Sequence, residues 1–114
     1  MRMDEERLRD ILDAIDAIRR RVGADRSAFD ADELLRVWCL HHITVIGEAT
    51  TRLSTELRAK HPDPPWRSII GMRNAVVHGY FEVDWDEVWM VVARDLDPLR
   101  ASIEVVLRAK TSTD

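Results

Sequence analysis

The sequence predicts an all-α protein, most simply an antiparallel bundle of four to five helices. Apolar residues recur at helical spacing along most of the chain, no segment shows the alternation typical of a strand, and the connectors are short. The chain has 114 residues, of which 46% are apolar. Because this is enough to bury a core without disulfides or metals, we expect residues 1–114 to form a single domain.

The first expected helix covers about residues 5–22. Its apolar positions lie three or four residues apart, charged residues fill the gaps, and Gly23 provides a natural stop. Residues 24–31 are expected to form a connector. Asp25 and Asp32 are among the candidate caps for the neighbouring helices.

The second expected helix covers about residues 32–60 and includes His42 in its apolar stripe. Pro62, Pro64 and Pro65 then close it, because proline lacks the backbone donor and restricts the residue before it. The prolines therefore predict an extended connection to the next helix.

The third expected helix covers about residues 65–78 and ends at Gly79, which can adopt the left-handed conformation common at helix ends. A short turn leads to Asp84, a candidate N-cap, and helical periodicity then continues to near Arg108. Pro98 interrupts that last run. Since proline in a helix interior costs about 3 kcal/mol, we expect a break or kink there.

A polar motif stands at the end of the third expected helix. Arg73, His78 and Tyr80 follow the spacing R-x4-H-x-Y, and Asn74 directly follows the arginine. A guanidinium recognises phosphate oxygens and an imidazole moves protons near neutral pH. Together they suit phosphodiester cleavage in which a ribose 2'-hydroxyl attacks its own adjacent phosphate, Arg73 stabilises the developing charge and His78 transfers a proton. By residue type alone, capping, ion pairing or dipole complementation is the commoner role of such residues at a helix end.

The geometry of this motif also bears on assembly. On a helical wheel Ile69, Met72 and Val76 lie together on the expected core side, and Arg73 borders it. On the same wheel Arg73 and His78 lie about 140° apart, so in one straight helix they would not face the same atom. Either the helix unwinds near its end, or two copies of the chain contribute to a shared cleft.

The motif resembles the R-x4-H-x-Y signature of HepT-like proteins, toxin components within the HEPN superfamily of helical ribonucleases. The similarity covers most of the chain, in the usual order of the family: Ile46-Gly47-Glu48-Ala49, Leu57-x3-His61-Pro62, Pro65-Trp66-x2-Ile69-Ile70-Gly71-Met72-Arg73-Asn74 and Val83-Asp84-x4-Val88-Trp89. It implies a HEPN-like helical fold.

The resemblance also implies an activity and partners. It implies a homodimeric, metal-independent endoribonuclease toxin of a type II toxin-antitoxin system, with Arg73 and His78 as the catalytic pair and Asn74 supporting them. The substrate is RNA, cut at a composite dimer cleft, and no cofactor is expected. The implied antitoxin is an MNT-type nucleotidyltransferase that neutralises the toxin by AMPylation of Tyr80, placing phosphate charge beside Arg73. Gly79 departs from the family, where an acidic or larger residue often stands.

A second hypothesis, from another class, is a noncatalytic helical interaction module that binds a nucleotidyltransferase or a nucleotide. The formal net charge of -4 argues against broad, tight binding of nucleic acid, so RNA would need a local basic cluster. The candidates, which could equally be solvated or ion-paired, are Arg36, Arg52, Arg58, Lys60 and Arg67.

Other residues favour structural interpretations. Adjacent His41 and His42 point about 100° apart on a helix and cannot chelate one metal, so we interpret His42 as a hydrogen-bonded core or interface residue. Gly47 indicates a close helix contact, and Glu48 is interpreted as a structural residue that orients Arg73.

Three tryptophans, Trp66, Trp85 and Trp89, are expected to pack rather than to stack on bases. The single cysteine, Cys39, is expected to be a buried thiol in a reducing compartment. No apolar stretch reaches the roughly 20 residues that span a bilayer, and residues 1–9 do not resemble a signal peptide. We therefore expect a cytoplasmic protein with no membrane partner.

Overall fold

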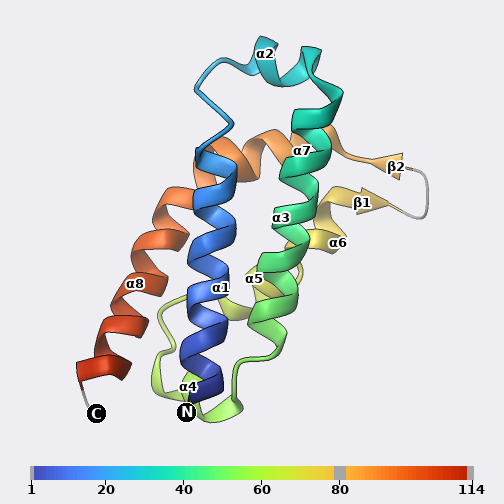
Figure 1. Ribbon diagram of the computed structural model, residues 1–114. Coiled ribbons are helices and arrows are strands. Elements are labelled where there is room, and N and C mark those ends of the chain that lie inside the picture. Colours follow the sequence, from blue (N-terminus) through green and yellow to red (C-terminus); the bar gives the residue numbers. More distant parts are fainter. Residues whose placement is uncertain (1, 79–81, 113–114) are drawn as a thin grey trace.

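The computed structural model describes residues 2–78 and 82–112 and confirms the all-α class (Figure 1). The elements, in chain order, are α1 Arg2–Arg19, α2 Arg26–Ala31, α3 Glu33–Thr51, α4 Thr55–Lys60, α5 Trp66–Ile70, α6 Met72–Val76, β1 Val77–His78, β2 Glu82–Val83, α7 Trp85–Met90, the π-helical turn η1 Val91–Asp95 and α8 Leu96–Ser112. Within the described residues, no helix has the length and apolar character that a membrane crossing requires.

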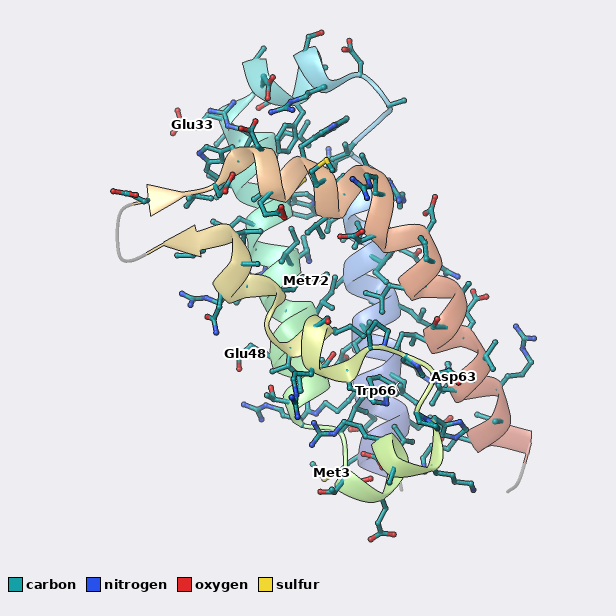
Figure 2. All side chains as sticks on the ribbon, turned by 180° about the vertical axis from the view of Figure 1, so that it is seen from behind. Met3, Glu33, Glu48, Asp63, Trp66 and Met72 are labelled. Atoms are coloured by element: carbon teal, nitrogen blue, oxygen red, sulfur yellow. The ribbon has the colours of Figure 1, made fainter. Side chains whose placement is uncertain are left out.

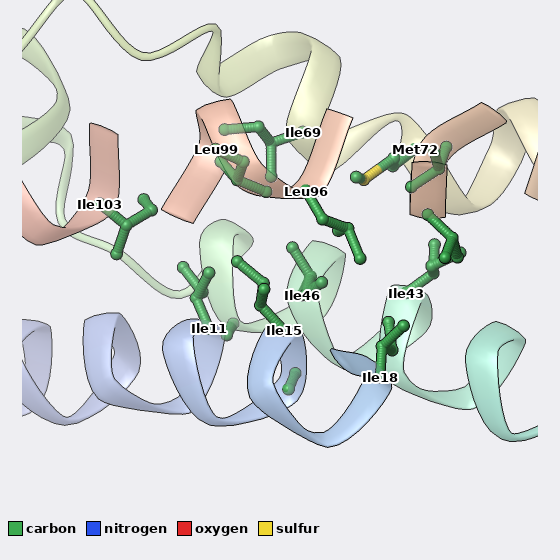
Figure 3. Packing of buried hydrophobic residues seen from close by; sticks show 14 of the residues in the cluster. Ile11, Ile15, Ile18, Ile43, Ile46, Ile69, Met72, Leu96, Leu99 and Ile103 are labelled. Carbon is green, nitrogen blue, oxygen red and sulfur yellow. The ribbon is translucent and has the colours of Figure 1, made fainter. Parts of the chain in front are cut away.

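The long helices α1 and α3 lie side by side and antiparallel, with α8 beside α1 and the α5–α6 segment against α3 (Figure 1). Their facing sides form one buried apolar cluster, part of which Figure 3 shows. Arg100 fixes α8 to α1, because its Nε and Nη2 donate to the two carboxylate oxygens of Asp16 at 2.8 and 3.0 Å. The residues labelled in that view come from α1, α3, α5, α6 and α8: Ile11, Ile15, Ile18, Ile43, Ile46, Ile69, Met72, Leu96, Leu99 and Ile103.

The caps around the first connector are confirmed, but the connector contains a helix of its own. Asp25 caps α2 by accepting from the backbone N of Ser27, and Asp32 caps α3 by accepting from that of Leu35. Helix α1 ends at Arg19, before the expected stop at Gly23. The N-terminal periodicity therefore located the helix correctly and misplaced its end.

The prediction of a single helix over residues 32–60 is wrong, because the helix is interrupted between α3 and α4. Ser54 causes the break. Its Oγ accepts from the backbone N of Leu57 and so caps α4, while its own N and Oγ donate to the Asp4 carboxylate at 2.9 and 2.6 Å. A hydrogen-bonded cap therefore replaces the continuous helix.

The third helix also differs from expectation. It begins at Trp66, directly after Pro65, and has a joint at Gly71. It ends at Val76 rather than Gly79, because the next two residues pair with β2 in antiparallel register, Val77↔Val83 and His78↔Glu82. The short turn expected before Asp84 is therefore preceded and followed by two-residue strands, which are too short to show the alternation of a strand in the sequence.

In the last helical run the predicted cap at Asp84 is confirmed, but the irregularity lies before Pro98 rather than at it. Asp84 caps α7 by accepting from the backbone N of Glu87. No break occurs at Pro98, which is the third residue of α8; a π-helical turn stands immediately before that helix. Helix α8 continues directly from η1, so Pro98 stands inside one helical run, and the π-turn contains Arg94, the residue four positions earlier whose carbonyl the proline ring would meet. The chain changes direction between α7 and α8 (Figure 1).

Candidate active site

Helix α6 positions the first half of the motif. Met72 is 9% exposed and Val76 fully buried, one helical turn apart, and Ile69 of α5 joins them in the core. Arg73 and Asn74 are exposed on the other side. The wheel prediction for this helix is confirmed, and the two buried anchors fix the direction in which Arg73 leaves the helix.

Arg73 carries an unneutralised charge. Among the described residues it forms no hydrogen bond or ion pair. Other arginines lie within ion-pair distance of carboxylates: Arg7, Arg9, Arg19, Arg26, Arg100 and Arg108. The Arg73 guanidinium therefore keeps all its donors for a ligand.

The second half of the motif lies on a different element. The backbone of His78 is in β1, opposite Glu82. The side chain of His78, and Gly79 and Tyr80 entirely, lie outside what the structure describes. The straight helix assumed by the wheel argument is wrong beyond Val76, so the 140° separation does not apply. Of the two alternatives, the helix does unwind, three residues before Gly79.

A backbone hydrogen bond ties the base of the β1–β2 hairpin to the end of α6. The backbone N of Asp84 donates to the carbonyl oxygen of Val76 at 2.6 Å, next to the Val77–Val83 pair. Val77 and Val83 are half-buried against the core. The backbone on both sides of residues 79–81 is thus fixed relative to Arg73.

The supporting roles proposed for neighbouring residues need correction. Glu48 is exposed and forms no hydrogen bond or ion pair with Arg73, so the interpretation that it orients this arginine is wrong. The close contact at Gly47 is confirmed, since a Cβ there would lie 3.5 Å from the carbonyl oxygen of Ile70.

His42 is not hydrogen-bonded, contrary to expectation. Both ring nitrogens are buried without a partner among the described residues, and the ring packs edge-on against Trp38 with centroids 4.5 Å apart. Burial lowers the pKa of His42, and the neighbouring His41 and Arg20 lower it further. The neutral form is therefore favoured. The described residues contain no group of three or more His, Cys, Asp or Glu placed to hold a metal.

The buried thiol and the packing role of tryptophan are confirmed. Burial raises the pKa of the Cys39 thiol to about 11, and its side chain has no exposed area. Trp66 is 9% exposed and donates to the His61 carbonyl oxygen at 2.7 Å. Trp89 packs against Phe29 with ring centroids 5.2 Å apart.

Two of the candidate basic residues lie on one groove. Arg58 of α4 and Arg67 of α5 line a hollow of about 470 Å³ whose wall includes Trp66 and Ile70. Arg36 instead donates to the carbonyl oxygen of Phe29 at 3.3 Å. The sequence identifies the candidate arginines but does not show which of them lie together, because their arrangement depends on how α4 packs beside α5.

Comparison with known proteins defines the class. The family model described as Ribonuclease HepT-like matches residues 11–106. The chain therefore belongs to the HepT-like ribonuclease family, and the resemblance found in the sequence is confirmed. This membership supports a ribonuclease function with RNA as the substrate class.

Individual relatives match along nearly their whole length. A protein of Methanocaldococcus jannaschii named as a candidate RNase is 31% identical over 100 residues, 87% of this chain and 92% of the relative. A similarly named protein of Caldanaerobacter subterraneus is 31% identical, covering 80% of this chain and 81% of the relative. One of Thermococcus cleftensis, named as a probable ribonuclease HepT, is 29% identical, covering 90% and 94%. No solved structure gives a significant match.

Proposed function

We propose that this protein is a cytoplasmic, metal-independent endoribonuclease that cleaves RNA with Arg73 and His78. The observation that carries the proposal is the exposed Arg73 guanidinium, which has no partner among the described residues and is held by two buried neighbours on a helix that leads directly into the strand of His78. A fixed cation without a protein partner is suited to a charge that develops on a substrate.

The proposed reaction uses the ribose 2'-hydroxyl as nucleophile. Its oxygen forms a bond to the adjacent phosphorus while the bond from phosphorus to the 5'-oxygen breaks, leaving a 2',3'-cyclic phosphate and a 5'-hydroxyl. Arg73 stabilises the negative charge on the non-bridging oxygens, His78 transfers a proton and Asn74 supports them. A protein that acts this way requires RNA, because DNA lacks the nucleophile.

The test compares wild type with Arg73→Ala and His78→Ala on single-stranded RNA in the presence of a chelator. Arg73→Ala should lose about 10²–10³-fold in rate, the effect of removing a stabilising donor, and His78→Ala about 10²–10⁴-fold. Arg94→Ala is the matched control, since Arg94 is also exposed and lies on η1. Equal cleavage of a 2'-deoxy substrate would refute the mechanism. Absence of cleavage by folded, unmodified wild type would favour the noncatalytic interaction module.

We further propose that two subunits form the cleft as a homodimer. Mixing Arg73→Ala with His78→Ala tests this. If each site takes Arg73 from one subunit and His78 from the other, mixed dimers contain an intact site and activity returns. If both residues act from the same chain, the mixture stays inactive, and sedimentation then shows whether a dimer exists at all.

The regulatory part of the proposal is a type II toxin-antitoxin pair. An MNT-type nucleotidyltransferase would transfer AMP to Tyr80, and the added phosphate would compete with RNA for Arg73. Coexpression with that partner should add the mass of AMP to the chain. An adduct that persists in Tyr80→Phe would rule out this tyrosine as the target.

A further inference from the structure

A second basic feature lies along the same helical segment as Arg73. The groove between α4 and α5 has a volume of about 470 Å³ and is lined by Thr55, Arg58, Ala59, Trp66, Arg67 and Ile70. Figure 2 shows the α5–α6 segment crossing over α3, with Trp66 and Met72 labelled along it. The groove therefore lies beside the α5 part of the segment that carries the motif.

The groove is positively charged, although the whole chain has a formal net charge of -4. Neither Arg58 nor Arg67 forms an ion pair with a described residue. No carboxylate lines the groove, whereas four other hollows of the described surface each include at least one, such as Asp95, Asp4, Glu48 and Asp63. Two uncompensated guanidinium groups facing one hollow indicate an anionic ligand.

Arg58 provides an independent sign that a partner belongs there. Its Nε is buried and has no acceptor among the described residues. A buried donor without an acceptor is unfavourable, and buried polar groups are normally hydrogen-bonded. A small shift of this long side chain toward an anion in the groove supplies the acceptor. Helix-dipole complementation at the end of α4 explains the charge of Arg58 but leaves that donor unsatisfied.

The groove lies directly before the motif on the α5–α6 segment. Trp66, Arg67 and Ile70 form its α5 wall, and the positions three and four residues beyond Ile70 are Arg73 and Asn74. Gly71 forms a turn between the two helices, and its N donates to the Arg67 carbonyl oxygen at 3.0 Å.

Arg67 and Arg73 are separated by six residues, which is about 9 Å along the helix and about 120° around it, whereas Asn74 lies on the same side as Arg67. An anionic chain that starts at Arg67 and bends partly around the segment meets Arg73 as well. Guanidinium groups spaced along one surface are a common means of following a single-stranded nucleic acid backbone.

We propose that the Arg58–Arg67 groove binds the sugar-phosphate backbone of RNA a few nucleotides from the phosphate held at Arg73. The inference deepens the proposed ribonuclease function and rests on it for the identity of the ligand. Because the tryptophan in the wall is buried and its Nε1 already donates to the protein, the groove offers charge rather than base stacking. The contribution is therefore to affinity and not to sequence preference.

Binding is measured first, with the catalytic step blocked by His78→Ala. Three variants are titrated with a labelled single-stranded RNA of about 12 nucleotides at several salt concentrations. The first carries His78→Ala alone, the second also carries Arg58→Gln and Arg67→Gln, and the third, the control, carries His78→Ala and Arg94→Gln. Losing two phosphate contacts should reduce the slope of log K against log salt by about 1.4 and weaken binding by about an order of magnitude at low salt. The control should leave both unchanged.

Cleavage is measured second, with otherwise wild-type protein. A dinucleotide with a single phosphodiester cannot reach the groove, so the groove variants should cut it as wild type does. On the longer RNA they should show a raised KM. Arg67→Gln alone, at an exposed position, keeps the test valid if a change at Arg58 impairs folding.

The outcomes separate the two proposals. Unchanged affinity and salt slope in the groove variants overturns the groove assignment, as does loss of binding to a nucleotidyltransferase partner with RNA binding intact. Groove-dependent RNA binding by a wild type that cuts no RNA supports the groove and refutes the enzyme. Equal losses on the dinucleotide and the longer RNA also overturn the assignment, since the defect then lies at the reaction site.

Discussion

Replacing Asp4 with alanine should destabilise the protein strongly, although Asp4 lies near the start of the chain. Asp4 is 5% exposed, and its carboxylate accepts from the N and Oγ of Ser54 at 2.9 and 2.6 Å. A hydrogen bond to a charged group contributes about 1.5–3 kcal/mol, so two give at most about 6 kcal/mol. Because Ser54 is only half-buried and water can replace part of this, we expect a loss of about 2–4 kcal/mol.

The assay is unfolding by urea and by heat, each monitored by circular dichroism. A chain of this length is expected to have a free energy of unfolding of about 6–17 kcal/mol, so the loss is a substantial fraction. At about 4 °C per kcal/mol, the Tm should fall by roughly 8–16 °C.

The matched control is Asp25→Ala. Asp25 accepts from the N and Oγ of Ser27 at the same two distances, 2.9 and 2.6 Å, but the pair is exposed and only two residues apart. Its removal should cost far less, because water replaces the lost partners and no distant segments are joined. Equal losses in Asp4→Ala and Asp25→Ala would refute the reasoning that burial and long-range linkage set the magnitude.

The same pair predicts a dependence on pH. Burial by itself raises the pKa of the Asp4 carboxyl, but the hydrogen bonds from Ser54 outweigh it and the net pKa is lowered from its usual value of 3.8. The folded state thus holds this proton less tightly than the unfolded chain. The stabilisation is fully present above about pH 3.8 and is lost as the pH falls below it. Asp4→Ala should remove that part of the acid sensitivity.

Three further substitutions or modifications test the core. Gly47→Ala should raise the free energy of unfolding by about 0.5–1 kcal/mol, since the added methyl meets the Ile70 carbonyl oxygen at ordinary contact distance; a loss in urea unfolding would contradict this. The lowered pKa of His42 means that stability holds above about pH 6.5 and falls below it, and His42→Phe should weaken this dependence relative to wild type. Cys39 should resist thiol reagents until urea unfolds the protein, because burial raises its pKa to about 11; rapid labelling of folded protein would contradict its burial.

Periodicity and capping chemistry were sufficient for the local features of the fold. The core side of the third helix at Met72 and Val76, and the caps at Asp32 and Asp84, are confirmed because each depends on residues within one or two turns. The same local rules placed Arg73 at the border of the apolar face, where it is found exposed.

The break before α4 and the basic groove depend on contacts between residues that are far apart in the sequence. The break before α4 requires Ser54 to meet Asp4, fifty positions earlier, and nothing near Ser54 signals that contact. His42 lacks the hydrogen bond expected of it: its ring packs on Trp38 of the same helix, and no described residue reaches its buried nitrogens. The groove of Arg58 and Arg67 was equally hidden, since it forms only when the connector brings α4 and α5 together.

The early end of the third helix changes the argument about assembly. A dimer was suggested by geometry only because Arg73 and His78 diverge in a straight helix, and the helix has already ended at Val76. Arg73 lies on α6 and the backbone of His78 belongs to a paired strand, so the divergence on a straight helix no longer argues for a second chain. Gly79 is likewise not the residue that terminates the helix. The homodimer therefore stays a proposal that no longer rests on the wheel, and recovery of activity on mixing Arg73→Ala with His78→Ala is the measurement that tests a site shared between two subunits.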